Sequence, residues 1–103
     1  MIKIQFANAN SFEQAVFEHE LSEVQGIKVE KVEQSGFDGL EIVYYFIYAG
    51  GAVCLINSIK EVIIKAIERN KDNIIKINGI ELKGYSIKDA IALLDKILNE
   101  NIN

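Results

Sequence analysis

The chain has 103 residues, of which 50 % are apolar and 25 % are charged, so its composition is that of a folded globular domain. This length supports one hydrophobic core and is too short for two, so we expect a single domain over residues 1–103. The formal net charge is −4, and residues 1–50 carry three lysines against eight acidic residues. Such an acidic balance argues against nucleic acid as a partner and is compatible with a basic protein surface.

The only cysteine, Cys54, excludes an intramolecular disulfide bond. It lies within the apolar run 52–56, which predicts a buried and unreactive thiol. The first residues lack the charged leader and apolar core of a signal peptide. We therefore expect a protein of the reducing cytoplasm.

The first predicted elements are a strand and a helix. Apolar and polar residues alternate over Ile2–Phe6, as in a half-buried strand. Ser11 with Gln14 three positions later is the pattern of a capping box, which predicts a helix from Phe12 to about Val24. Gly26 is expected to end this helix.

A second strand is predicted over Ile27–Glu33, where apolar residues are interspersed with Lys and Glu. The next segment is harder to interpret, because Ile42–Ile56 contains fifteen residues without a charge. A membrane-spanning helix needs about 20 apolar residues, so this run is too short and membrane association is not expected. The β-forming residues of Ile42–Tyr48 suit a buried strand, whereas the regular apolar spacing from Ala52 to Ile67 suits a helix. We favour one long helix over the whole segment.

A β-hairpin and a final helix are predicted after this segment. Asn78-Gly79 stands between the alternating runs Ile74–Ile77 and Ile80–Lys83, and this dipeptide favours a type I′ turn. Ser86 with Asp89 forms a second capping box before a helix rich in Ile and Leu. The predicted order is β-α-β-α-β-β-α: an α+β domain with a mixed four-stranded sheet and helices packed on it, ferredoxin-like in style.

Residues that could perform catalysis are few. His19 shares a helix face with Glu23, but two ligands do not make a metal site, and a solvated histidine is the simpler interpretation. The pair Gly50-Gly51 has neither the spacing nor the Lys-Ser/Thr of a phosphate-binding loop. We therefore expect no enzymatic activity, no cofactor and no bound metal.

The best candidate for function is a protein interface around the tyrosine-rich segment. Tyrosine combines apolar area with a polar tip, and no Lys or Arg stands between these tyrosines as nucleic-acid stacking would require. The two glycines let a second backbone approach closely. Self-association and a separate protein partner are both open, and the tyrosines could instead complete a monomeric core. The candidate interface residues are Tyr44, Tyr45, Tyr48, Gly50 and Gly51.

The whole arrangement resembles the effector-associated constant component family of bacterial conflict systems. The similarity lies in the short first strand, the helix that leads into Leu21–Val29, the apolar segment broken by Ala49–Ala52, the hairpin over Ile74–Lys83 and the last Ile- and Leu-rich helix. In place of the family's Arg-rich helix end with a Trp, residues 60–71 here carry mixed charge and no tryptophan.

The resemblance implies a non-enzymatic accessory or adaptor component of an anti-phage defence system. Such a protein would act by association with an effector or regulatory subunit, and a homo-oligomer is also open. Two alternatives remain at this stage: a small-molecule-binding regulatory module, and a membrane-associated component that uses residues 40–56.

Overall fold

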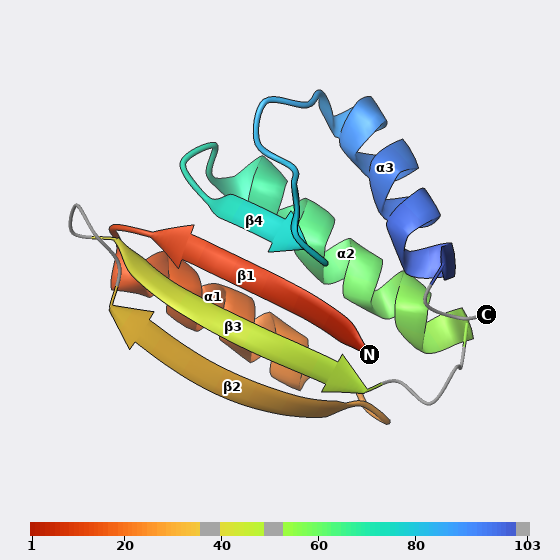
Figure 1. The fold of residues 1–103 in the computed structure, drawn as a ribbon, viewed down its shortest axis with the longest axis horizontal. Helices are drawn as coiled ribbons and strands as arrows, with labels where there is room; N and C mark the ends of the chain where they lie inside the picture. The colour runs from red at the N-terminus through yellow and green to blue at the C-terminus, as the bar shows by residue number, and fades with distance from the viewer. Residues whose placement is uncertain (36–39, 49–52, 101–103) are drawn as a thin grey trace.

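The computed structural model describes residues 1–35, 40–48 and 53–100, and Figure 1 shows their arrangement. Within these ranges five strands and three helices follow one another in the order β-α-β-β-α-β-β-α. Their bounds are β1 (Ile2–Asn8), α1 (Ser11–Ser22), β2 (Lys28–Ser35), β3 (Glu41–Tyr48), α2 (Val53–Arg69), β4 (Ile74–Ile77), β5 (Ile80–Glu81) and α3 (Ile87–Glu100).

The strands form one sheet in the order β2-β3-β1-β4-β5, and every neighbouring pair is antiparallel. The α+β class is confirmed, while the predicted mixed sheet of four strands is wrong. β3 lies between β1 and β2, and β1 lies between β3 and β4. The units β1-α1-β2 and β3-α2-β4 are therefore two interlocked split β-α-β units. Because each crossover skips one strand, no parallel neighbours remain.

The helix predicted from Leu40 onward is wrong over residues 41–48, which form the strand β3. β3 pairs along its full length with β2 on one side, and its residues 41–47 pair with β1 on the other, from Ile2↔Ile47 to Asn8↔Glu41. A strand with a neighbour on each side satisfies its backbone hydrogen-bonding groups as a helix does. The β-forming side chains of residues 41–48 therefore favour the strand. The predicted helix is confirmed from Val53 to Arg69. Its proposed course through residues 49–52 lies outside the described residues.

The start of α1 differs from the prediction by one residue. Asn10, and not Ser11, is the N-cap, and its side chain accepts a hydrogen bond of 2.9 Å from the backbone N–H of Phe12. Asn8 in turn accepts a bond of 2.7 Å from the N–H of Asn10, which holds the chain as it leaves β1. Gln14 therefore serves no capping box. Its amide donates to Glu18 at 2.6 Å instead.

The hairpin between β4 and β5 is confirmed. Asn78 and Gly79 have φ values of 51° and 84°, as the central residues of a type I′ turn require. The predicted start of the last helix is also confirmed, because Ser86 Oγ accepts a hydrogen bond of 3.2 Å from the N–H of Asp89.

The hydrophobic core lies on one side of the sheet. Figure 1 shows α1 and α2 behind the strands, with α3 alongside α2. At its centre the rings of Phe6 and Phe17 stack with 4.9 Å between centroids, and Tyr45 lies 5.6 Å from Phe17. None of the helices in the described ranges combines the length and the apolar character that a membrane crossing requires.

Candidate functional site

The strand β3 presents different chemistry to the two sides of the sheet. Val43, Tyr45 and Ile47 point toward the helices and are at most 3 % exposed. The alternate residues point to the opposite side, where no described helix covers the sheet (Figure 1). Directly paired residues of antiparallel strands share a face, so the register defines this side completely. We call it the open face; its residues are Lys3, Gln5, Ala7, Lys28, Glu30, Val32, Gln34, Ile42, Tyr44, Phe46, Tyr48, Ile74, Lys76 and Glu81.

The structure separates the three tyrosines predicted at an interface. Tyr44 is half-buried and Tyr48 is 41 % exposed, and both lie on the open face. Tyr45 lies on the covered side and is 1 % exposed. Its hydroxyl accepts a hydrogen bond of 3.2 Å from Gln14, and burial raises the pKa of its phenol to about 12. Tyr45 is therefore a core residue. The other two candidates, Gly50 and Gly51, lie outside the described residues.

Two residues of the open face were missed in the sequence. Phe46 stands between Tyr44 and Tyr48 on the same side of β3, so three aromatic rings follow one another along the strand. The ammonium group of Lys3, on β1, lies 5.0 Å from the ring centroid of Tyr44 and 6.0 Å from that of Phe46, within cation–π distance. Alternation along β3 could have identified Phe46. Lys3 is distant in sequence, and only strand pairing brings it to the rings.

The open face is basic relative to the rest of the chain. It carries Lys3, Lys28 and Lys76 against Glu30 and Glu81, a formal charge of +1, whereas the whole chain carries −4. Lys28 and Glu30 lie 3.8 Å apart and partly neutralise each other at the β2 edge. Lys3, in contrast, stands among the aromatic rings without an acidic partner among the described residues.

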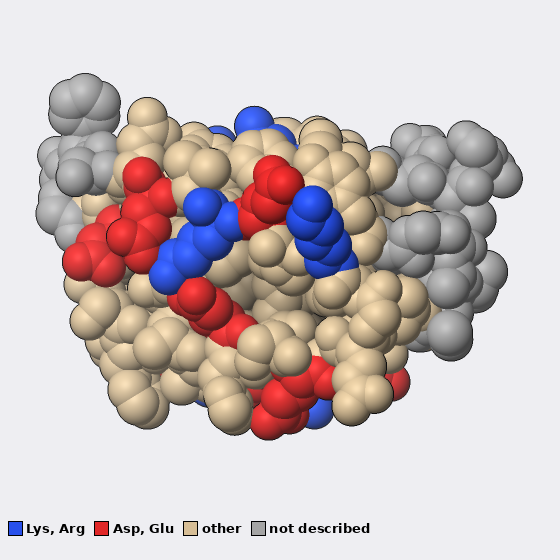
Figure 2. Space-filling view, turned by 90° about the horizontal axis from the view of Figure 1, so that it is seen from below, with Lys and Arg blue, Asp and Glu red and all other residues tan. Residues whose placement is uncertain are grey.

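The edge of the sheet at β2 is strongly charged. Figure 2 views the molecule from this side and shows acidic and basic side chains intermingled across its middle. Lys31 points to the covered side of the strand and forms ion pairs of 2.9 Å with both Glu33 and Glu18. These carboxylates raise the pKa of Lys31, Glu33 contributing most. Charged residues that point inward on an edge strand obstruct pairing with another strand. The open face is therefore a better interaction surface than this edge.

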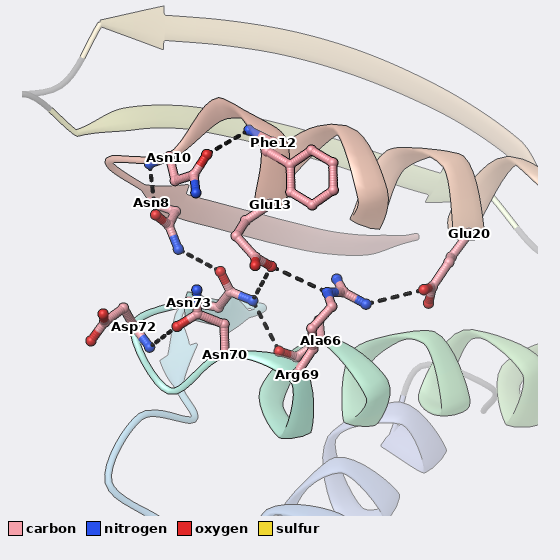
Figure 3. Close-up of polar contacts among 10 residues, drawn as sticks. All are labelled: Asn8, Asn10, Phe12, Glu13, Glu20, Ala66, Arg69, Asn70, Asp72 and Asn73. Carbon is pink, nitrogen blue, oxygen red and sulfur yellow. Dashed lines mark hydrogen bonds and ion pairs between the residues drawn. The ribbon is translucent and has the colours of Figure 1, made fainter.

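A buried polar cluster joins the ends of β1, α1 and α2 (Figure 3). Glu13 Oε2 accepts hydrogen bonds from Arg69 Nε at 3.1 Å and from Asn73 Nδ2 at 3.3 Å. Arg69 Nη1 also donates to Glu20 Oε1 at 3.0 Å, and Asn73 Oδ1 accepts a bond from Asn8. The hydrogen bond between Asn8 and Asn73 joins residues 65 positions apart, so the cluster connects distant parts of the chain.

The electrostatics of the cluster indicate a structural role. Burial raises the pKa of Glu13, but hydrogen bonds from Asn70, Arg69 and Asn73 outweigh burial, and the net pKa is lowered. Glu13 is therefore an ionised carboxylate that accepts hydrogen bonds from its neighbours. The side chains of the cluster hold one another in place, apart from Glu20 Oε2, a buried oxygen without a hydrogen-bond partner among the described residues.

His19 lies on the exposed surface of α1, where its Nε2 is 3.0 Å from Glu23 Oε1. In the part of the chain that the structure describes, no group of three or more His, Cys, Asp or Glu side chains could hold a metal ion. Cys54 belongs to the first turn of α2, but its side chain is outside the described part, so its predicted burial stays a prediction.

Comparison with protein-family models, with curated proteins and with solved structures finds no match to this chain. The resemblance to the effector-associated constant component family therefore stays a prediction.

Proposed function

We propose that the protein is a non-enzymatic accessory component of a bacterial conflict or anti-phage defence system, and that it binds an effector protein through the open face. The observation that carries the proposal is the row of Tyr44, Phe46 and Tyr48 on a sheet side that no described helix covers. The scaffold for this face is a ferredoxin-like core, β1-α1-β2-β3-α2-β4, to which β5 and α3 are added.

The dimensions of the open face suit a reversible interaction. The five strands are 7, 8, 8, 4 and 2 residues long, and at about 3.3 Å per residue and about 4.8 Å per strand one side of the sheet spans on the order of 500 Å². Stable specific interfaces bury about 800 Å² per partner, and transient ones bury less than about 600 Å². An adaptor that recruits or restrains an effector needs binding that can be reversed, which the smaller area supports.

The charges of the open face define the chemistry of the partner. Lys3 lies among the rings without an acid beside it, so its burial by a purely apolar surface would leave a charge unpaired. The partner surface is therefore apolar with a carboxylate opposite Lys3. A second copy of this chain would bring another Lys3 and a face of the same sign. Charge complementarity thus favours a different protein over self-association.

The proposal can be tested by capture of the tagged protein from its native host, followed by measurement of affinity with the purified partner. Tyr48→Asp and Lys3→Glu place negative charge on the open face and should weaken binding by about tenfold or more. Tyr85→Asp is the matched control for the first variant, because Tyr85 is 50 % exposed and lies away from this face. Lys96→Glu, on the exposed side of α3, is the control for the second.

Thermal melting of each variant separates loss of binding from loss of folding. If both open-face variants bind the effector as tightly as the wild type does, the open face is not the binding surface. Capture that yields no effector would contradict the proposed function itself. Sedimentation of the purified protein shows whether it self-associates. A dimer that dissociates in the Tyr48→Asp variant would mean that the open face binds a second copy of the chain and not an effector.

A further inference from the structure

A cavity of about 610 Å³ lies on the helical side of the molecule, away from the open face. It is bounded by the end of α2, by the start of β4 and by the connection from β5 to α3. We call it the α2–α3 cavity. Ligand sites for small molecules usually measure about 300 to 1,000 Å³, so its size is sufficient for a compact organic molecule.

The lining of the α2–α3 cavity combines apolar walls with a basic rim. Ile67, Ile75, Leu82 and Ile87 supply aliphatic surface, and the half-exposed ring of Tyr85 stands beside them. The charged residues of the lining are Glu68, Lys71 and Lys83, a formal charge of +1. No ion pair joins Lys71 or Lys83 to an acid among residues 1–35, 40–48 and 53–100.

The walls are held in place by hydrogen bonds of their own. Asn73, in the lining and 4 % exposed, donates at 2.9 Å to the carbonyl of Ala66 and belongs to the buried polar cluster. Leu82 N–H donates at 3.0 Å to the carbonyl of Ile75, which fixes the far wall against β4. Gly84, with φ of 92°, lets the chain turn there toward α3. A cavity with fixed walls loses little conformational entropy when a ligand binds.

We propose that the α2–α3 cavity binds a small organic anion with an apolar body, whose charged group meets Lys71 and Lys83. The apolar walls favour burial of a hydrocarbon or aromatic body, and the two ammonium groups outnumber the single carboxylate of the lining, Glu68. This inference goes beyond the proposed protein association, because it concerns a different side of the molecule and a different class of ligand.

The test uses two fluorescent probes with nearly the same aromatic body. 1-Anilinonaphthalene-8-sulfonate carries one anionic group, and N-phenyl-1-naphthylamine carries none. We expect the folded protein to bind one sulfonate probe per chain and to bind the neutral probe about tenfold more weakly. The double variant Lys71→Gln/Lys83→Gln should remove this preference without an effect on the neutral probe.

Lys65→Gln/Lys96→Gln is the matched control, since it removes the same charge from two exposed lysines outside both the lining and the open face. Amide chemical shifts should change mainly over residues 67–71 and 82–87 when the sulfonate probe is added. Equal affinity of the wild type for both probes would overturn the inference. So would a loss of affinity for the sulfonate probe in the control variant as large as that in Lys71→Gln/Lys83→Gln. Shifts concentrated on β2 and β3 would also overturn it, since the probe would then occupy the open face. Tyr48→Asp should leave probe binding unchanged, so failure here is distinguishable from failure of the proposed interface.

Discussion

Tyr44 and Tyr45 are neighbours with the same side chain and opposite environments. Tyr45 is 1 % exposed and packs against Phe17 under the helices, whereas Tyr44 lies half-buried on the open face beside Lys3. The same division runs through the whole sheet. One side carries the core of the domain, and the other carries aromatic side chains that the described part of the chain leaves uncovered.

Apolar composition does not by itself indicate burial in a strand. Successive side chains of a strand point to opposite sides, so every second residue of β3 serves the core. The remaining residues contribute little to the core and are available for binding. Four pairs of substitutions compare buried positions with exposed ones.

The largest effect is expected for Phe17→Ala in α1. Phe17 is fully buried and stacks on Phe6, so its truncation should lower the free energy of unfolding by about 3 to 5 kcal/mol. Phe12→Ala in the same helix is the control, because Phe12 is 67 % exposed, and a change within about 0.5 kcal/mol is expected. Urea denaturation of both variants measures this. Similar losses in the two variants would contradict the proposed core.

The second prediction concerns Glu13 and acid pH. Because the folded-state pKa is lowered, ionised Glu13 stabilises the fold above its ordinary pKa of 4.5, and this contribution is lost as pH falls through the lower folded value. Glu13→Gln should therefore cost about 1 to 3 kcal/mol at neutral pH and progressively less in acid. Glu61→Gln, at an exposed position of α2, is the control, and its cost should stay within about 0.5 kcal/mol over the same pH range. Urea denaturation at several pH values between 2 and 7 decides the matter.

The third prediction applies one substitution to both sides of the sheet. Val43→Thr places a hydroxyl in the core, at a position that is 3 % exposed, and should cost about 1 to 3 kcal/mol. Val32→Thr makes the same change on the open face, at 51 % exposure, and should cost less than about 0.5 kcal/mol. Thermal and urea denaturation compare the two. Equal costs would show that the open face also contributes to folding.

The smallest effect is expected for Tyr45→Phe, which removes the hydrogen bonds of a buried hydroxyl and should cost about 1 kcal/mol. Tyr44→Phe should be nearly neutral. The phenol of Tyr45 has its pKa raised from 10.0 to about 12, so its contribution to stability is complete below pH 10 and is lost as pH rises toward 12. Absorbance of tyrosinate should show one late-titrating group that Tyr45→Phe removes. A titration without that group in the wild type would place Tyr45 outside the core.

Much of the candidate site could be predicted, but not its geometry. The tyrosine-rich segment was identified as a candidate interface from composition, and two of its three tyrosines lie on the open face. Tyr45 could not be separated from Tyr44, because a helix was expected there and the alternation of a strand was not applied. The place of Lys3 beside the rings depends on its pairing with Phe46 across strands, which no local pattern indicates.

Local patterns are sufficient to predict the α+β class, the hairpin at Asn78-Gly79 and the apolar stripes of α2 and α3, because these depend on residues close together in the chain. Local patterns do not predict that residues 41–48 form a strand or that the helices leave one side of the sheet open; both depend on long-range contacts. The physical reason is that an uncharged run satisfies a helix and a central strand equally well. Pairing with β1 and β2, formed by distant segments, selected between them.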